Sequence, residues 1–246
     1  MSLTELQNYT FVGRYARWIP EKKRRETWKE SVDRVKTMMY AQYPEANGEI
    51  EWAYDMMYKK RILGSQRALQ FGGEPIFKHH ARIYNCIASY CDRLRFFQEC
   101  MYLLLCGCGT GFSVQKHHIN KLPPLIKKPS KDYKKFVVDD SIEGWSDAVG
   151  ALVSSYFKNS LFPEYQGVNI TFDYSNVRPA GAFLSSSSGK APGPEPLKKA
   201  LANIKKVLDR CVKQGLKKLR PIDVYDVVMH SADAVISGGV RRSATI

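Results

Sequence analysis

The sequence lacks both a long hydrophobic run and a secretory leader. Its longest candidate run, Met101–Leu105, is far shorter than the roughly 18 apolar residues that a membrane-spanning helix needs. The N-terminus, Met-Ser-Leu-Thr-Glu, has no basic segment followed by an apolar one. We therefore expect a cytoplasmic protein without a membrane partner.

Metal-binding and disulfide patterns are absent as well. The six cysteines form neither a CxxC pair nor zinc-finger spacing, and no HExxH or paired-carboxylate signature is present. The cysteines are Cys86, Cys91, Cys100, Cys106, Cys108 and Cys211. A chain of 246 residues without a leader is a poor candidate for a disulfide scaffold. We predict no metal and reduced thiols, so that any special cysteine would be catalytic or redox-active.

Acidic residues are few relative to basic ones. There are 24 acidic residues against 38 basic ones, which gives a formal net charge of +14. Such an excess favours a polyanionic partner, namely nucleic acid, nucleotide phosphates or an acidic membrane, or it merely makes the surface soluble. The basic residues are spread over several segments and form no nucleic-acid motif or basic-aromatic stripe. Nucleic acid is therefore not the expected partner, although a basic nucleotide- or nucleic-acid-binding module remains the alternative function.

The sequence has the composition of a globular protein, with 44% hydrophobic and 25% charged residues. Apolar residues at helical spacing predict one helix through Trp28 and Met39 and another over Glu51–Leu63. A buried strand is predicted at Tyr84–Ala88, and Asp92 is predicted to cap the helix that follows it.

The rest of the chain continues the alternation of strands and helices. A glycine turn, Gly107–Gly111, leads into a predicted strand, and Asp140–Glu143 resembles a capping box before an amphipathic helix. Val168–Phe172 is a predicted strand, and Ala180–Pro196 is a predicted surface loop before two more helices. The last residues, Val240–Ile246, resemble the start of a strand. The order predicts an α/β fold that is part of a larger one.

Several motifs have both a structural and a functional interpretation. Gly107–Gly111 fits neither a Rossmann nor a Walker A loop, and it is a tight turn unless a ligand approaches its backbone. Ser237–Arg242 can bind phosphate through two guanidinium groups, or it can simply end a helix. Ser185–Lys190 suits a phosphate or a flexible loop, and Cys86 is either a core residue or a site residue.

Taken together, the motifs resemble the monomeric, adenosylcobalamin-dependent (class II) ribonucleoside-triphosphate reductases. Stretches that carry the resemblance, in the family's order, are Arg67–Gly73, Tyr84–Cys86, the glycine turn into Phe112–Val114, and Ser237–Ala244. Two further stretches are typical of the monomeric branch: Asp139–Trp145 and Phe172–Gly181. The resemblance covers nearly the whole chain, and the ordered set of motifs is more specific than any one of them.

The resemblance implies a fold, a reaction and a set of site residues. It implies an N-terminal helical region over residues 1–66, then the first half of a ten-stranded α/β barrel over 67–246. An insertion at about 121–165 would build an effector site without a dimer partner. Cys86 matches the first cysteine of the pair that reduces the substrate. Residues matching the ribose and diphosphate region are Gln70, Asn85 and Gly109. Residues matching the effector site are Asp92, Arg178, Ser185, Ser186, Gly189, Gly238, Gly239, Arg241 and Arg242.

Several parts of the family's machinery do not occur in this sequence. The thiyl-radical cysteine, the second cysteine of the reducing pair and the shuttle cysteines all come later in the family, as does most of the cobalamin-binding surface. We therefore expect the N-terminal part of a reductase that converts ribonucleoside triphosphates by radical chemistry. Its implied partners are a deoxynucleoside triphosphate effector, a C-terminal reductase fragment, adenosylcobalamin and a dithiol reductant such as thioredoxin. The chain is expected to be inactive alone.

Overall fold

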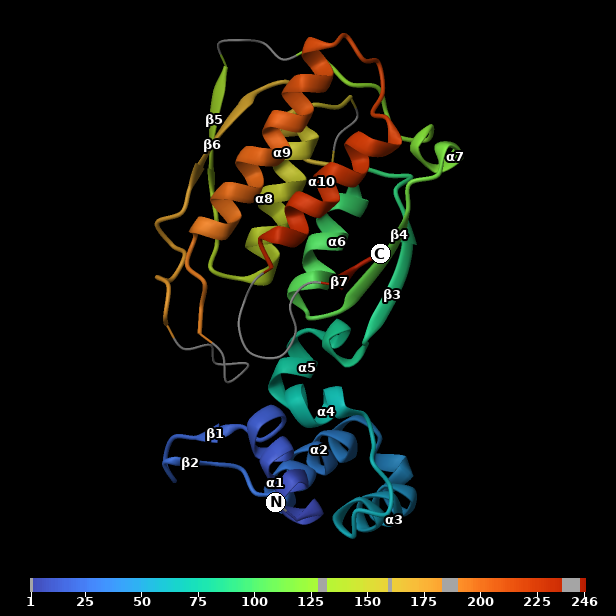
Figure 1. Cartoon of the computed structure of the whole chain (residues 1–246), viewed down its shortest axis with the longest axis vertical. Helices are drawn as coiled ribbons and strands as arrows, with labels where there is room; N and C mark the ends of the chain where they lie inside the picture. The colour runs from blue at the N-terminus through green and yellow to red at the C-terminus, as the bar shows by residue number, and fades with distance from the viewer. Residues whose placement is uncertain (1, 128–131, 159–160, 183–189, 236–243) are drawn as a thin grey trace. The chain divides into compact units, whose positions relative to one another are not determined.

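The computed structural model describes residues 2–127, 132–158, 161–182, 190–235 and 244–246 (Figure 1). The chain divides into two compact units, the first formed by Met1–Asn85 and the second by Cys86–Ala182 with Lys190–Ile246. Among the described residues, no helix combines the length and apolar character needed to cross a bilayer.

The first unit is mostly helical, as predicted. Its helices are α1 (Leu3–Arg14), α2 (Trp28–Gln42), α3 (Asn47–Tyr58), α4 (Gln66–Phe71) and α5 (Glu74–Lys78), with short 3-10 turns η1 (Pro44–Ala46) and η2 (His80–Ile83) and a hairpin of β1 (Trp18–Ile19) and β2 (Arg24–Arg25). Thr27 begins α2 with a capping box, because its hydroxyl accepts from the Glu30 amide while the Glu30 side chain accepts from the Thr27 amide. The predicted α2 face is confirmed at Val32 and Val35, although Met38 is buried more deeply than Met39.

The segment that follows residue 66 packs within the first unit. Leu69, Phe71 and Ile76 share a core cluster with Val32 and Val35 of α2. Burial of these apolar side chains explains why the compact units divide after Asn85. The resemblance places a boundary between a helical region and a barrel at residues 66/67, and this boundary stays a prediction.

The second unit contains a parallel sheet. Its strands are β3 (Cys86–Tyr90), β4 (Gly109–Ser113) and β7 (Ala244–Thr245), in the order β3-β4-β7. Cys86 is the register partner of Gly109, which is in turn the partner of Ala244. Helix α6 (Arg95–Leu105) connects β3 to β4, which is the crossover that a parallel pair requires. The α/β class and the terminal strand are therefore confirmed, while the ten-stranded barrel stays a prediction.

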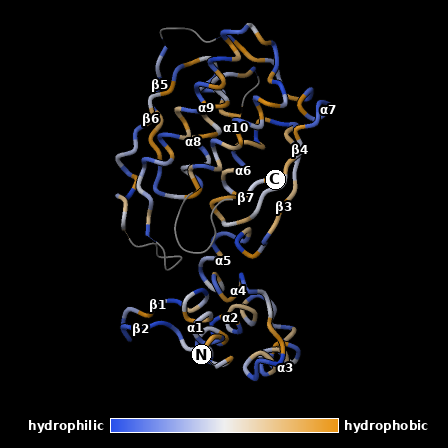
Figure 2. The backbone as a smooth tube through the Cα atoms, in the orientation of Figure 1, coloured by the Kyte–Doolittle hydropathy of each residue, from blue (hydrophilic) through white to orange (hydrophobic). Residues whose placement is uncertain are grey.

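A layer of helices covers one face of this sheet. The remaining elements are α7 (Lys116–Ile119), α8 (Ile142–Ser154), α9 (Glu195–Lys213), α10 (Pro221–Asp233), the turn η3 (Pro163–Tyr165) and a parallel pair of β5 (Tyr133–Val137) and β6 (Asn169–Asp173). Apolar and polar residues alternate along α9 and α10 (Figure 2). The predicted α9 and α10 faces are confirmed, because Leu197, Ile204, Leu208, Val224 and Val228 are almost fully buried.

Two predicted helix starts are wrong by a few residues. Asp92 does not cap α6, which has Leu94 at its N-cap and no side-chain cap bond. The Asp92 carboxylate is paired with Arg93 instead, at 2.9 Å. Ser141, not Asp140, caps α8, because its hydroxyl accepts from the Gly144 amide at 2.9 Å. At α8 a neighbouring hydroxyl is the cap, and at α6 the Asp92 carboxylate is engaged in an ion pair instead.

Substitution of Gly144 tests how closely the start of α8 packs against the backbone of Asp139. A Cβ atom at residue 144 would lie 2.6 Å from the Asp139 carbonyl oxygen and 2.8 Å from its amide nitrogen. These are backbone atoms that cannot turn away, so Gly144→Ala should lower the free energy of unfolding by about 1–3 kcal/mol. Gly48, near the start of α3, has open space around it, and Gly48→Ala should be neutral or slightly stabilising. Thermal unfolding followed by circular dichroism compares the two, and equal midpoints would contradict this packing.

Candidate functional site

One face of the β3-β4-β7 sheet carries the predicted catalytic cysteine. Phe112 on β4 contacts Phe96 of α6 and Tyr225 of α10, with ring centroids 5.9 and 6.3 Å apart, so this side of the sheet is covered by helices. Side chains alternate between faces along a strand, so Gly109 lies on the opposite face from Phe112. Its register partner Cys86 shares that opposite face.

Cys86 is exposed, and the prediction that it is buried is wrong. Strand β3 is an edge strand with the burial pattern of alternating exposed and half-buried residues, and Cys86 begins it on the face away from α6. The residues around it on that face are small: Gly109 and then Ala244 follow it across the sheet, and Ala88 and Gly111 come next along the strands. The other five cysteines are buried, and none of the six, which are all described residues, forms a disulfide. A small molecule can therefore approach this one sulfur without displacing bulky side chains.

Two of the three predicted substrate residues adjoin Cys86 along the chain or across the sheet. Asn85 directly precedes Cys86 and is exposed, and Gly109 is paired with Cys86. Gln70 lies on α4 in the first unit, where its side-chain amide donates to the Arg14 carbonyl at 3.5 Å. Its own backbone carbonyl accepts from the Arg17 guanidinium at 3.1 Å. The structure therefore places two of the three at the cysteine and gives Gln70 a local hydrogen-bonding role.

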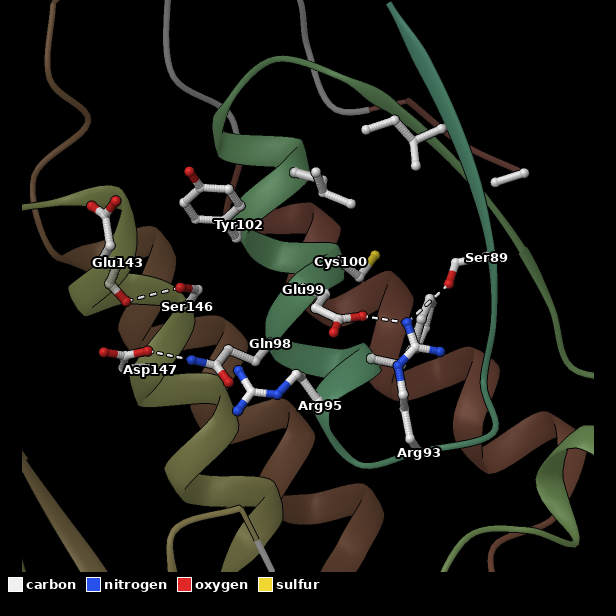
Figure 3. Close-up of a pocket in the computed structure, with 14 residues that line it drawn as sticks. Ser89, Arg93, Arg95, Gln98, Glu99, Cys100, Tyr102, Glu143, Ser146 and Asp147 are labelled. Atoms are coloured by element: carbon white, nitrogen blue, oxygen red, sulfur yellow. Dashed lines mark hydrogen bonds and ion pairs between the residues drawn. The ribbon is translucent and has the colours of Figure 1, made fainter. Parts of the chain in front are cut away.

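A pocket of about 470 Å³ lies on the other side of β3, between α6 and α8 (Figure 3). Its volume is in the range of small-molecule sites. Ser89, Arg93 and Glu99 meet at one end, where the Arg93 guanidinium is 2.5 Å from Glu99 and 3.2 Å from the Ser89 hydroxyl. The other polar side chains that line it are Arg95, Gln98, Tyr102, Glu143, Ser146 and Asp147.

Gln98 and Asp147 form a half-buried polar pair at the centre of this pocket. The Gln98 amide nitrogen donates to the Asp147 carboxylate, as Figure 3 shows. Burial raises the pKa of Asp147, and the hydrogen bond from Gln98 only partly opposes this. The Gln98 carbonyl oxygen is buried without a hydrogen-bond partner among the described residues. A ligand that enters the pocket with a donor group would satisfy this oxygen.

Two of the nine predicted effector residues, Asp92 and Arg178, lie in the described part of the chain. Asp92 lies between Arg93, at 2.9 Å, and Lys121, at 3.7 Å; partial burial opposes its ionisation, but these cations keep its pKa below the usual range. Arg178 is 2.5 Å from Asp140, so it and Asp92 have separate ion partners. The predicted effector residues that lie outside the described part of the chain are Ser185, Ser186, Gly189, Gly238, Gly239, Arg241 and Arg242.

None of the pocket residues is among the site residues predicted from the sequence. The signal was present as two polar stripes at helical spacing, one over Arg95, Gln98 and Tyr102 on α6 and one over Glu143 and Asp147 on α8. A polar stripe on an amphipathic helix usually faces water. Only the packing of α6 against α8 shows that these two stripes face each other.

Comparisons with known proteins agree with the motifs. The family described as "B12-dependent ribonucleotide reductase, insertion domain" matches residues 114–208, an interval that contains the predicted insertion. The chain is 27% identical to the adenosylcobalamin-dependent ribonucleoside-triphosphate reductase of Lactobacillus helveticus, over 98% of the chain and 41% of that protein. It is 26% identical to a putative reductase of the same description from Mycobacterium phage D29, over 89% of the chain and 36% of that protein.

A solved structure gives the same fold. It is the crystal structure of a B-12 dependent (class II) ribonucleotide reductase, with a TM-score of 0.81 and 24% identity over 96% of this chain. The chain spans about two fifths of the length of these relatives, 41% for the Lactobacillus helveticus protein and 40% for the solved structure. The resemblance drawn from the motifs is confirmed over nearly the whole chain.

The different exposure of the six thiols leads to a labelling prediction. Iodoacetamide should alkylate Cys86 rapidly in the native chain, because the other five cysteines are buried. Burial also raises the pKa of Cys100 to about 12 and that of Cys211 to about 11, which disfavours their reactive thiolates. Peptide mass spectrometry should find one fast site, which Cys86→Ser removes. Fast labelling of a second cysteine would contradict the burial described here.

Proposed function

We propose that this chain, which resembles the class II ribonucleotide reductases over nearly its whole length, supplies the N-terminal portion of an adenosylcobalamin-dependent ribonucleoside-triphosphate reductase. The supporting observation is the exposed Cys86, which begins β3 beside Gly109 on a sheet face lined by small residues. That face leaves room for a nucleotide sugar next to a reactive sulfur. The remaining portion of the enzyme would complete the site.

Cys86 is proposed as one of the two thiols that reduce the substrate. The overall reaction replaces the ribose 2′-hydroxyl with hydrogen and releases water, while two cysteine thiols become one disulfide. Cys86 would provide one of these thiols, and the second would come from the portion of the enzyme beyond the residues of this chain. A dithiol protein such as thioredoxin would then reduce the disulfide, in the cytoplasm where thiols are kept reduced.

Asn85 and Gly109 are proposed to position the substrate. Asn85 precedes Cys86 and carries an amide that can both donate to and accept from sugar hydroxyls. Gly109 has no side chain and leaves the backbone open beside the Cys86 sulfur. Gln70, on α4 of the first unit, is kept as a proposed substrate residue on the strength of the motif match alone.

The relatives are named as adenosylcobalamin-dependent enzymes. In this enzyme the cofactor would supply the radical that starts the reaction. The pocket between α6 and α8 does not fit it: about 470 Å³ suits a small ligand, and a corrin macrocycle with its nucleotide tail is larger. We therefore propose that the cofactor is held mainly by the remaining portion of the enzyme.

A deoxynucleoside triphosphate effector is proposed to bind in the pocket between α6 and α8 of the second unit. Asp92 is joined through Arg93 to the pocket between these helices, and Arg178 pairs with Asp140, which directly precedes the N-cap residue of α8. Two loops are proposed to complete the site, with Arg241 linking effector and substrate. The first loop contains Ser185, Ser186 and Gly189, and the second contains Gly238, Gly239, Arg241 and Arg242.

A binding assay tests the effector proposal. Arg95 lines the pocket and has no carboxylate within 4 Å among the described residues, so it is available for a phosphate. Arg95→Gln should weaken deoxynucleoside triphosphate binding by roughly tenfold or more, because a charge-assisted hydrogen bond is removed. Arg61→Gln, an exposed arginine of the first unit, is the matched control. Isothermal titration calorimetry measures both, and equal affinities would contradict the proposed location.

An activity assay tests the reductase proposal. The chain is combined with the corresponding remaining portion of a class II reductase, and conversion of a ribonucleoside triphosphate is measured with adenosylcobalamin and dithiol. Cys86→Ser should lower turnover to background, because an alcohol cannot deliver the electrons. Cys211→Ser is the matched control: this buried cysteine lies on α9 beside Asp223, and its replacement should leave turnover largely intact. Turnover by the Cys86→Ser variant with dithiol as the only reductant would overturn the proposal.

A further inference from the structure

Three separate basic segments of the second unit are joined by backbone hydrogen bonds. The Leu125 amide donates to the Lys217 carbonyl at 2.9 Å, and the Ile126 amide donates to the Tyr156 carbonyl at 2.9 Å. The Lys158 amide donates to the Pro124 carbonyl at 3.4 Å. Exposed lysines lie on the segments that these bonds join, and we name them together the lysine surface: Lys121, Lys127, Lys158, Lys213, Lys217 and Lys218.

The lysine surface contains almost no compensating negative charge. Segments 116–127, 156–158 and 213–220 contain no aspartate or glutamate. Within the described ranges, Lys121 alone of the six has a carboxylate within 4 Å, the Asp92 oxygen at 3.7 Å. Three other lysines of the same unit are paired with carboxylates: Lys135–Asp173, Lys198–Glu195 and Lys205–Asp209, at 2.5–2.6 Å. Five of the six lysines of the lysine surface thus keep a charge that no nearby carboxylate of the described residues neutralises, unlike the three paired lysines.

The side chains at this surface favour one kind of polyanion. Lysine is a compact point charge that suits phosphate oxygens, whereas protein–protein interfaces are depleted in lysine and enriched in arginine and aromatic residues. Single-stranded nucleic acid is usually held by exposed aromatic side chains on which bases stack. Here Tyr156 and Phe157 are fully buried, so these two rings offer no such platform.

We propose that the lysine surface binds the phosphate backbone of double-stranded nucleic acid without reading its sequence. This function goes beyond the proposed reductase activity and does not rest on it, because the lysine surface uses none of the residues assigned to substrate, and it involves Asp92 only through Lys121. The fold gathers cations that are far apart in the sequence, which is why their linear distribution shows no nucleic-acid motif.

The test measures binding of the 246-residue chain to a short random-sequence DNA duplex by fluorescence anisotropy over a range of salt concentrations. The test variant replaces Lys127, Lys158 and Lys217 with glutamine; the matched control replaces the paired residues Lys135, Lys198 and Lys205, which removes the same three charges. The slope of log affinity against log salt should fall in magnitude by about 3 in the test variant, since each phosphate that is no longer neutralised accounts for about 0.9. The control slope should change by less than about 1.

A third variant replaces the same three surface lysines with arginine and should keep the wild-type slope, which separates removal of charge from unfolding. Equal effects of the two glutamine triples would overturn the proposal, because the charge would then act diffusely. So would absence of salt-dependent duplex binding. Tighter binding of polyglutamate than of duplex, with the same sensitivity to the test variant, would assign the surface to an acidic protein and overturn the proposal as well.

Discussion

The parallel pairing of β3 with β4 is the constraint on which the candidate active site depends. It places Cys86 beside Gly109 and fixes which face of the sheet each residue occupies. Because Phe112 packs against α6 and α10 on one face, the cysteine must lie on the other. A shift of one residue in this register would turn Cys86 toward the helices and the half-buried Ile87 outward. The exposed thiol is thus a consequence of strand register and of the side on which the crossover helix packs.

The second site arises from the close approach of α6 and α8. A Cβ atom at Gly150 would lie 2.8 Å from the Phe162 ring and 3.4 Å from the Gln98 side chain, so glycine lets the two helices approach at this level. The approach brings Gln98 to Asp147 and encloses polar groups that would otherwise face water. The resulting pocket lies within the interval that matches the insertion domain of B12-dependent reductases on the α8 side, and outside it on the α6 side. The matched interval and the crossover helix together make a cavity that neither contains alone.

Much of the fold could be predicted from the sequence, because helix faces and strands have periodic signals. The faces of α9 and α10 and the strand at Val168–Phe172 follow from apolar spacing, and the family resemblance follows from ordered motifs. Exposure of Cys86 could not be predicted, since an apolar stretch does not reveal whether its strand lies at an edge. The Gln98–Asp147 hydrogen bond and the lysine surface join residues far apart in the chain, and no local pattern encodes such a pairing. The effector loops, which carry the most detailed assignments from the sequence, stay predictions.

The most direct measurement is a single turnover without external reductant, performed by the chain together with the remaining portion of a class II reductase. Peptide mass spectrometry would then identify the disulfide formed during that turnover. The account predicts a disulfide between Cys86 and a cysteine of the remaining portion, in an amount equal to the deoxynucleotide produced. Deoxynucleotide formed while the Cys86 thiol stays free would contradict the central claim that this exposed sulfur delivers the electrons.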